Sequence, residues 1–160
     1  MNLKRKSTLE LLRLISAVVA ELKHRAVIRA KNFTGDYAEF LAARALKLKS
    51  APISTPGFDG TDSSGIKYEV KGRQWTLSNK SRQFGVIRRL NSFDQMVGIV
   101  LGPDWTVDAA AVIPPKIVKQ FATWSEHQNG YILHGRDDVM KHPEARDITS
   151  QVTKAQISAT

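Results

Sequence analysis

The chain has 160 residues, of which 42% are hydrophobic, and it has a formal net charge of +9 and no cysteine. This length and composition predict one globular domain over residues 1–160, and they exclude disulfides and thiolate zinc sites. No apolar run approaches the roughly 20 residues that cross a bilayer, and nothing resembles a secretory signal. We therefore expect a cytoplasmic protein with a polyanionic partner and no membrane partner.

The first predicted element is an amphipathic helix. Ser7 and Glu10 have the spacing of a capping box. Apolar residues then recur at helical spacing, at Leu11, Leu12, Ile15, Val18, Val19 and Leu22. We interpret residues 1–31 as a helical extension that docks onto the core at residues 32–150 or onto a second subunit, so a homodimer is one option. The basic residues from Arg25 to Lys31 either bind phosphate or stabilise the helix C-terminus.

A second helix is predicted from residue 34 to about residue 48. One apolar stripe consists of Tyr37, Phe40, Leu41, Ala45 and Leu48. Glu39 falls on the far side, where its helical neighbours are Ala42, Ala43 and Leu46. The pattern therefore indicates a helix buried on both sides, with Glu39 inside the second apolar stripe.

A β-hairpin is predicted next, with strands at residues 58–62 and 66–73 joined by a turn at 62–65. The two-residue period of a strand places Ile66, Tyr68 and Val70 on one face, and Lys67, Glu69 and Lys71 on the other. The hairpin can bring Asp59 beside Glu69. Two carboxylates and a lysine that converge in this way predict a divalent-metal site for hydrolysis.

Asp59, the short turn and Glu69-Val70-Lys71 together resemble the motif of the PD-(D/E)XK nucleases, which have the restriction-endonuclease-like fold. The chain departs from that motif at Phe58, where the family has proline. The resemblance implies an α/β (α+β) fold, with a central mixed β-sheet flanked by helices. It also implies a nuclease that uses Mg²⁺ or Mn²⁺ to hydrolyse phosphodiester bonds, with DNA as the expected substrate.

Roles for individual residues follow from the resemblance. Asp59 and Glu69 would bind the metal together with the Val70 carbonyl, and Glu39 fits the position of a further acidic residue on the preceding helix. Asp36 is the rival to Glu39 for that position. Lys71 completes the catalytic set with Asp59, Glu69 and Glu39; it would orient or deprotonate the attacking water, or stabilise the charge of the transition state.

Positive charge is concentrated beside this motif. Residues 67–90 contain seven Lys and Arg residues against Glu69 alone. Their mixture with amides and hydroxyls suits phosphate contacts, although a solvated basic loop would have the same composition. The residues expected to bind nucleic acid are Lys67, Arg73, Gln74, Lys80, Arg82, Arg88 and Arg89.

The remaining chain is compatible with the same fold. Residues 96–101 and 105–113 predict a second hairpin, after which Pro114-Pro115 opens a short helix and residues 128–130 form a tight turn. Residues 137–150 mix helix and loop, and we expect the chain to fray from Gln151. Two other functions fit the sequence. The first is a non-catalytic nucleic-acid-binding or assembly module with this fold. The second is a basic partner protein in which Asp59 and Glu69 only pair with lysines.

Overall fold

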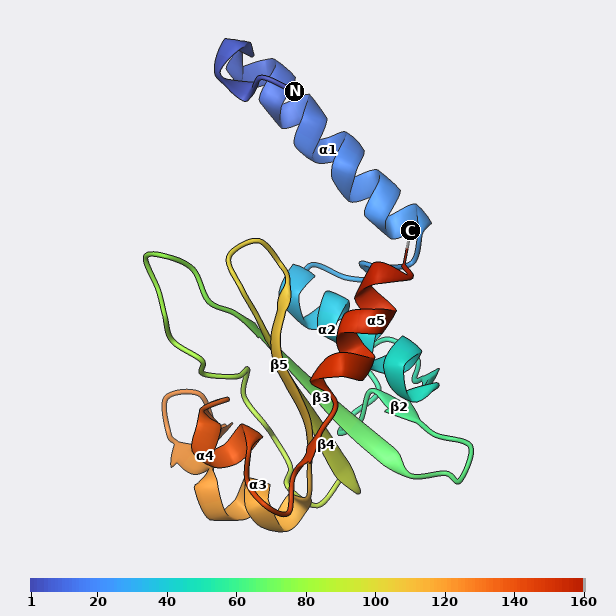
Figure 1. The fold of residues 1–160 in the computed structure, drawn as a ribbon, viewed down its shortest axis with the longest axis vertical. Coiled ribbons are helices and arrows are strands. Elements are labelled where there is room, and N and C mark those ends of the chain that lie inside the picture. Colours follow the sequence, from blue (N-terminus) through green and yellow to red (C-terminus); the bar gives the residue numbers. More distant parts are fainter. Residues whose placement is uncertain (160) are drawn as a thin grey trace.

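The computed structural model describes residues 1–159 and contains a six-stranded mixed β-sheet packed against helices (Figure 1). The strand order is β1-β2-β3-β4-β5-β8, and β6 and β7 form a separate two-stranded sheet. The expected α/β architecture with a central mixed sheet is therefore confirmed. The strands are β1 Lys49–Ser50, β2 Gly60–Thr61, β3 Lys67–Gln74, β4 Gln95–Leu101, β5 Val107–Ile113, β6 Thr123–Ser125, β7 Gly130–Ile132 and β8 Arg146–Asp147. The helices are η1 Leu3–Arg5, α1 Thr8–His24, α2 Phe33–Leu46, α3 Pro115–Phe121, α4 Asp137–Met140 and α5 Thr149–Ile157.

The connection between β3 and β4 is unusual. These two strands are parallel, whereas every other neighbouring pair in the six-stranded sheet is antiparallel. A parallel crossover usually contains a helix, but residues 75–94 form an irregular loop across one face of the sheet. Phe84 and Ile87, each 1% exposed, anchor this loop. We call residues 75–94 the crossover loop.

The sheet separates two hydrophobic cores. Along β4, Val97, Ile99 and Leu101 pack on the face that α2 and α5 cover, whereas Met96 and Val100 pack on the face that α3, α4 and the crossover loop cover. This alternation follows from the two-residue period of an interior strand that is buried on both faces.

The C-terminal segment does not fray, so that expectation was wrong. Residues Thr149–Ile157 form α5, in which Val152 is fully buried and Ala155 is 7% exposed. The Thr149 hydroxyl also accepts a hydrogen bond of 3.0 Å from the Ala110 N–H of β5. The core therefore extends beyond residue 150, because α5 buries its apolar residues against α2 and β5.

Helix α1 forms as expected but does not dock onto its own domain. The capping box between Ser7 and Glu10 is present. The helix projects away from the rest of the molecule (Figure 1), and none of its residues is buried. No helix within residues 1–159 is long and apolar enough to cross a membrane.

Gly72 allows α2 to lie close to β3. A Cβ atom on Gly72 would meet the Ala38 Cβ at 2.5 Å and the Thr34 carbonyl oxygen at 2.8 Å. Backbone and methyl groups cannot swing aside as a long side chain can, so any larger residue here would push α2 off the sheet.

We expect Gly72→Ala to lower the free energy of unfolding by about 1–3 kcal/mol, because it overpacks the contact between α2 and β3. Urea denaturation measures the change. Gly85→Ala is the matched control, since a Cβ atom at Gly85 meets nothing within 4 Å. Equal stability of the two variants would contradict the close contact at Gly72.

Candidate active site

Asp59 lies where β2 and β3 separate. The preceding turn requires Gly57, which has φ +90, and the Ser92 hydroxyl donates to the Gly57 carbonyl at 3.0 Å. The Asp59 N–H donates to the Tyr68 carbonyl at 2.8 Å, and the Asp59 Oδ2 atom accepts a hydrogen bond of 2.7 Å from the Val70 N–H. These bonds hold the Asp59 carboxylate against the edge of β3.

The backbone of Val70 faces the same place. Strand β2 pairs with β3 only at Tyr68 and Lys67, so it does not reach Val70. The N–H and C=O of one residue in a strand point to the same side of that strand. Because the Val70 N–H points at Asp59, the Val70 carbonyl faces that side as well.

Glu69 and Lys71 lie together on the face of β3 opposite Tyr68 and Val70, as the alternation predicted. The Glu69 Oε1 atom is 2.5 Å from the Lys71 Nζ atom, and Glu69 is only 9% exposed. Burying a carboxylate is costly unless it is paired, so Lys71 is the group that allows Glu69 to be there.

Both side chains line a pocket of about 230 Å³ together with Arg88 and Arg89 of the crossover loop. The loop comes back over β3 because Phe84 and Ile87 are buried below it. Arg88 and Arg89, about twenty positions after Glu69 in the sequence, therefore lie beside it in the fold. The pocket offers an ion pair at its base and two guanidinium groups in its wall.

The electrostatics centre on Asp59. Burial, followed by the charge of Glu69, raises the pKa of Asp59 from 3.8 to about 7. The charge of Glu39 also contributes to the rise, and the Val70 N–H and Lys71 partly offset it. Asp59 thus lies close enough to Glu69 for the charge of Glu69 to disfavour the ionised form of Asp59, as expected from the hairpin.

The expected cluster of three carboxylates is not formed. Glu39 lies near Asp59 and Lys71, since both pairs interact electrostatically, but the Arg29 Nη2 atom holds the Glu39 Oε2 atom at 2.7 Å. Within residues 1–159, no three His, Cys, Asp or Glu side chains are arranged to hold a metal ion. The assignment of Glu39 as third ligand is corrected accordingly: its carboxylate is neutralised by an arginine.

Asp36 is not the replacement. Its carboxylate is buried and accepts hydrogen bonds from the Arg29 N–H at 3.1 Å and the Ala30 N–H at 2.7 Å. Asp36 therefore fastens the segment before α2 and places Arg29 beside Glu39.

Arg29 is the residue of this site that sequence reasoning missed. It belongs to the basic stretch whose role the sequence left open, and it also donates to the Ala51 carbonyl at 3.1 Å. Spacing within one helix could not have predicted its contact with Glu39, because Arg29 lies in the turn between α1 and α2 whereas Glu39 lies on α2.

The remaining carboxylates fit a divalent cation of the Mg²⁺ type. Such an ion keeps several waters and needs only one or two carboxylates. Asp59 and Glu69 provide two. Burial and then the charge of Glu69 make the ionised form of Asp59 unfavourable, and a cation beside it would favour that form. The Val70 carbonyl faces the same side and adds an oxygen of the kind that hard cations prefer.

The residues expected to bind nucleic acid divide into two groups. Four of them bond within the protein: Arg73 to the Ser81 carbonyl, Gln74 to the Gly102 and Pro103 carbonyls, Arg82 to Asp137, and Arg88 to the Gln128 and Asn129 carbonyls. Lys67 lies 5.3 Å above the Phe58 ring. Lys80 and Arg89 are exposed, and of these two only Arg89 lines the pocket with Glu69 and Lys71.

Comparison with known proteins adds no identification. No protein-family model matches the chain, and no curated protein sequence matches it.

We expect Asp59→Asn to stabilise the protein above about pH 7 and to have little effect near pH 4. The pKa of Asp59 is raised to about 7 in the folded protein, so the stability that its protonation provides is fully present below its ordinary pKa of 3.8 and is lost as the pH rises through 7. Asparagine is neutral throughout. The gain is on the order of 2–4 kcal/mol.

Urea denaturation of both proteins between about pH 4 and pH 8 measures this difference. In addition, Mg²⁺ should raise the melting temperature of the wild type at high pH and not at low pH, because a proton and a cation compete for Asp59. A stability difference that does not change with pH would contradict the raised pKa.

Proposed function

We propose that this chain is a Mg²⁺- or Mn²⁺-dependent nuclease of the restriction-endonuclease-like fold that hydrolyses phosphodiester bonds in DNA. One observation supports this more than any other: the charge of Glu69 acts on the nearby Asp59, and Glu69 and Lys71 share a pocket with Arg88 and Arg89 of the crossover loop. A protein gains no stability from placing two like charges together in a partly buried position, so a functional reason is favoured.

The fold resemblance gains support from the architecture. A helix, α2, precedes the hairpin, and the hairpin places Asp59 immediately before β2 and Glu69-Val70-Lys71 on β3. The sheet is mixed and covered by helices. Phe58, which replaces the family's proline, packs with the core below the crossover loop.

Each residue has a distinct role in the proposed reaction. Asp59, Glu69 and the Val70 carbonyl would hold the metal ion, which supplies positive charge that offsets the charge developing on the phosphate. Lys71 is a cation already aligned by Glu69 at 2.5 Å, and it would donate to a phosphate oxygen. Arg89 would hold a neighbouring phosphate of the substrate.

A specific observation favours the second candidate, a non-catalytic nucleic-acid-binding module with this fold. Glu69 contacts Lys71, Asp59 accepts a hydrogen bond from the Val70 N–H, and Glu39 is bound by Arg29. All three acidic side chains thus have partners within the protein. A binding module would keep the basic loop and use these contacts only for stability.

Cleavage assays separate the two candidates. We expect the wild type with Mn²⁺ or Mg²⁺ to cleave at least one member of a panel of plasmid, linear, single-stranded and branched DNA and RNA. Asp59→Asn, Glu69→Gln and Lys71→Met should each reduce cleavage by at least about 100-fold, because each removes charge at the reacting phosphate. DNA binding should persist in all three.

Glu144→Gln is the matched control, since it removes a carboxylate from an exposed pair with Lys116 and should leave cleavage unchanged. Wild-type protein that binds DNA but cleaves nothing in the panel would establish the binding module instead. Full activity of Glu69→Gln would discard the proposed mechanism.

We further expect Arg89→Ala to weaken DNA binding and to reduce the salt dependence of binding by about one ion, because one phosphate contact is lost. Titrations at several salt concentrations measure both quantities. Lys154→Ala, on α5 across the sheet, removes one exposed cation and should change neither. Equal effects of the two substitutions would show that DNA does not lie over the pocket with Glu69.

A further inference from the structure

Helix α1 has an apolar stripe that no other element within residues 1–159 buries. Leu11, Ile15, Val18 and Leu22 recur at alternating spacings of four and three residues and share one side of the helix. Ile15 is 59% exposed and Val18 is 49% exposed, and Leu12 beside them is 56% exposed. A single helix of this length is only marginally stable in water unless its apolar side packs against something.

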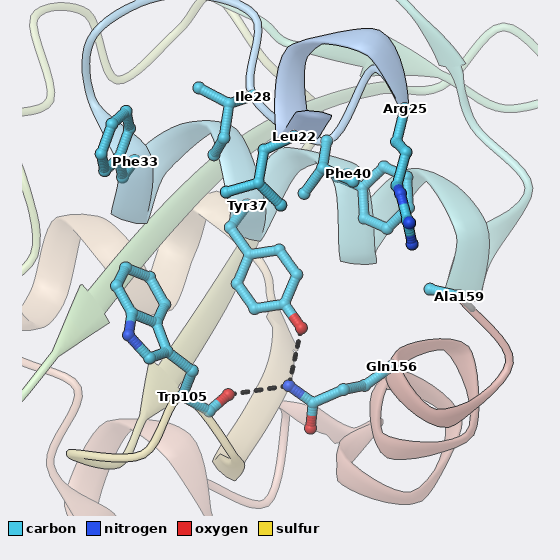
Figure 2. A pocket seen from close by; sticks show the side chains of 10 residues that line it. Leu22, Arg25, Ile28, Phe33, Tyr37, Phe40, Trp105, Gln156 and Ala159 are labelled. Atoms are coloured by element: carbon cyan, nitrogen blue, oxygen red, sulfur yellow. Dashed lines mark hydrogen bonds between the residues drawn. The ribbon is translucent and has the colours of Figure 1, made fainter. Parts of the chain in front are cut away.

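An apolar pocket lies at the base of the same helix (Figure 2). It has a volume of about 320 Å³, and Leu22 of α1 forms part of its wall. Its other walls are largely aromatic, with Phe33, Tyr37 and Phe40 from α2 and Trp105 from the turn before β5. Phe33 is 40% exposed and Trp105 is 36% exposed.

Hydrogen bonds and ring packing connect the walls of this pocket. The Gln156 side-chain amide of α5 donates to the Tyr37 hydroxyl at 2.8 Å and to the Trp105 carbonyl at 2.7 Å, as Figure 2 shows. Tyr37 and Trp105 also pack edge to face, with ring centroids 5.9 Å apart. The stripe and the pocket thus form one continuous apolar surface, which joins at Leu22.

We propose that this surface binds a second copy of the chain, with the two α1 helices antiparallel. The stripe is symmetric in this arrangement. Leu11 lies as many residues before the centre of the stripe as Leu22 lies after it. Ile15 and Val18 are related in the same way. An antiparallel pair therefore packs Leu11 against Leu22 of the second copy and Ile15 against Val18, twice over, as a two-fold interface requires.

The pocket selects the antiparallel direction. In an antiparallel pair, the N-terminal residues of one copy lie at the base of α1 of the other, beside the pocket. Met1 is 86% exposed and Leu3 is 50% exposed, so apolar side chains are available there to cover it. In a parallel pair these residues would point away from both pockets. A parallel pair would also place the β-branched Val18 where leucine is preferred.

The contact is large enough for a specific dimer. Each helix of 17 residues offers a strip about 25 Å long and about 10 Å wide. The two strips give roughly 500 Å², and the two pockets bring the total toward the roughly 1,000 Å² at which specific interfaces begin. The aromatic residues of the pocket are of the type that contributes most to binding.

Light scattering on the full chain tests the proposal. We expect twice the chain mass of 17.8 kDa at micromolar concentration. Ile15→Glu should give the mass of one chain, because it places a charge in the seam. Ala17→Glu, on the opposite side of the exposed helix, should remain a dimer. Circular dichroism confirms that the domain is folded, and this is expected because α1 buries no residue.

Engineered cysteines test the direction, since the chain has none of its own. Under mild oxidation, Leu11→Cys mixed with Leu22→Cys should form a disulfide-linked pair, whereas Leu11→Cys alone should not. A disulfide-linked pair from Leu11→Cys alone would overturn the antiparallel arrangement.

A wild-type protein with the mass of one chain at micromolar concentration would overturn the dimer itself. Sedimentation with vesicles that contain anionic lipid then tells whether the basic, amphipathic α1 binds a lipid surface instead. Vesicle binding by a monomer would replace the second copy as occupant of the stripe. Neither experiment depends on nuclease activity, so its failure would not affect the proposed function.

Discussion

The ion pair between Glu69 and Lys71 is the interaction on which the rest of the site depends. Strand β3 is an interior strand, so any charged group on its second face is nearly buried. Glu69 is tolerated there because Lys71, two residues along the same strand, reaches its carboxylate at 2.5 Å. Burial, and then the charge of Glu69, raises the pKa of Asp59 to about 7. Ionisation of Asp59 is thus unfavourable in the folded protein, and a bound cation or phosphate would change its cost.

The crossover loop connects two parallel strands, as a helix does in most such connections, and it also contributes residues to the site. Because it is irregular, it can present Arg88 and Arg89 over the second face of β3 while Phe84 and Ile87 fill the core below. Arg88 also holds the loop to the turn before β7 through the Gln128 and Asn129 carbonyls. Much of the positive charge near the site is therefore structural, whereas the exposed Arg89 is available to an external anion.

Close packing of α2 decides which acidic residue belongs to the site. Gly72 lets the helix approach β3, and the Asp36 carboxylate holds the preceding segment to α2 by accepting hydrogen bonds from two backbone N–H groups. This brings Arg29 to Glu39 and neutralises a carboxylate that helix geometry alone would have left free. The same turn aims α1 away from the core, which leaves its apolar stripe for a partner.

Local patterns determined much of this protein. The period of β3 correctly predicted that Tyr68 and Val70 enter the core and that Glu69 and Lys71 share the other face. The capping box of α1, the hairpin at Asp59 and the helix after Pro114 were also predicted, because each depends on neighbouring residues. Only the tertiary structure decided that residues 149–157 pack as α5, that Arg29 forms an ion pair with Glu39, and that Arg88 and Arg89 line a pocket with Glu69. Those contacts join residues far apart in the chain, or across a turn, and depend on how whole elements pack, which no local spacing encodes.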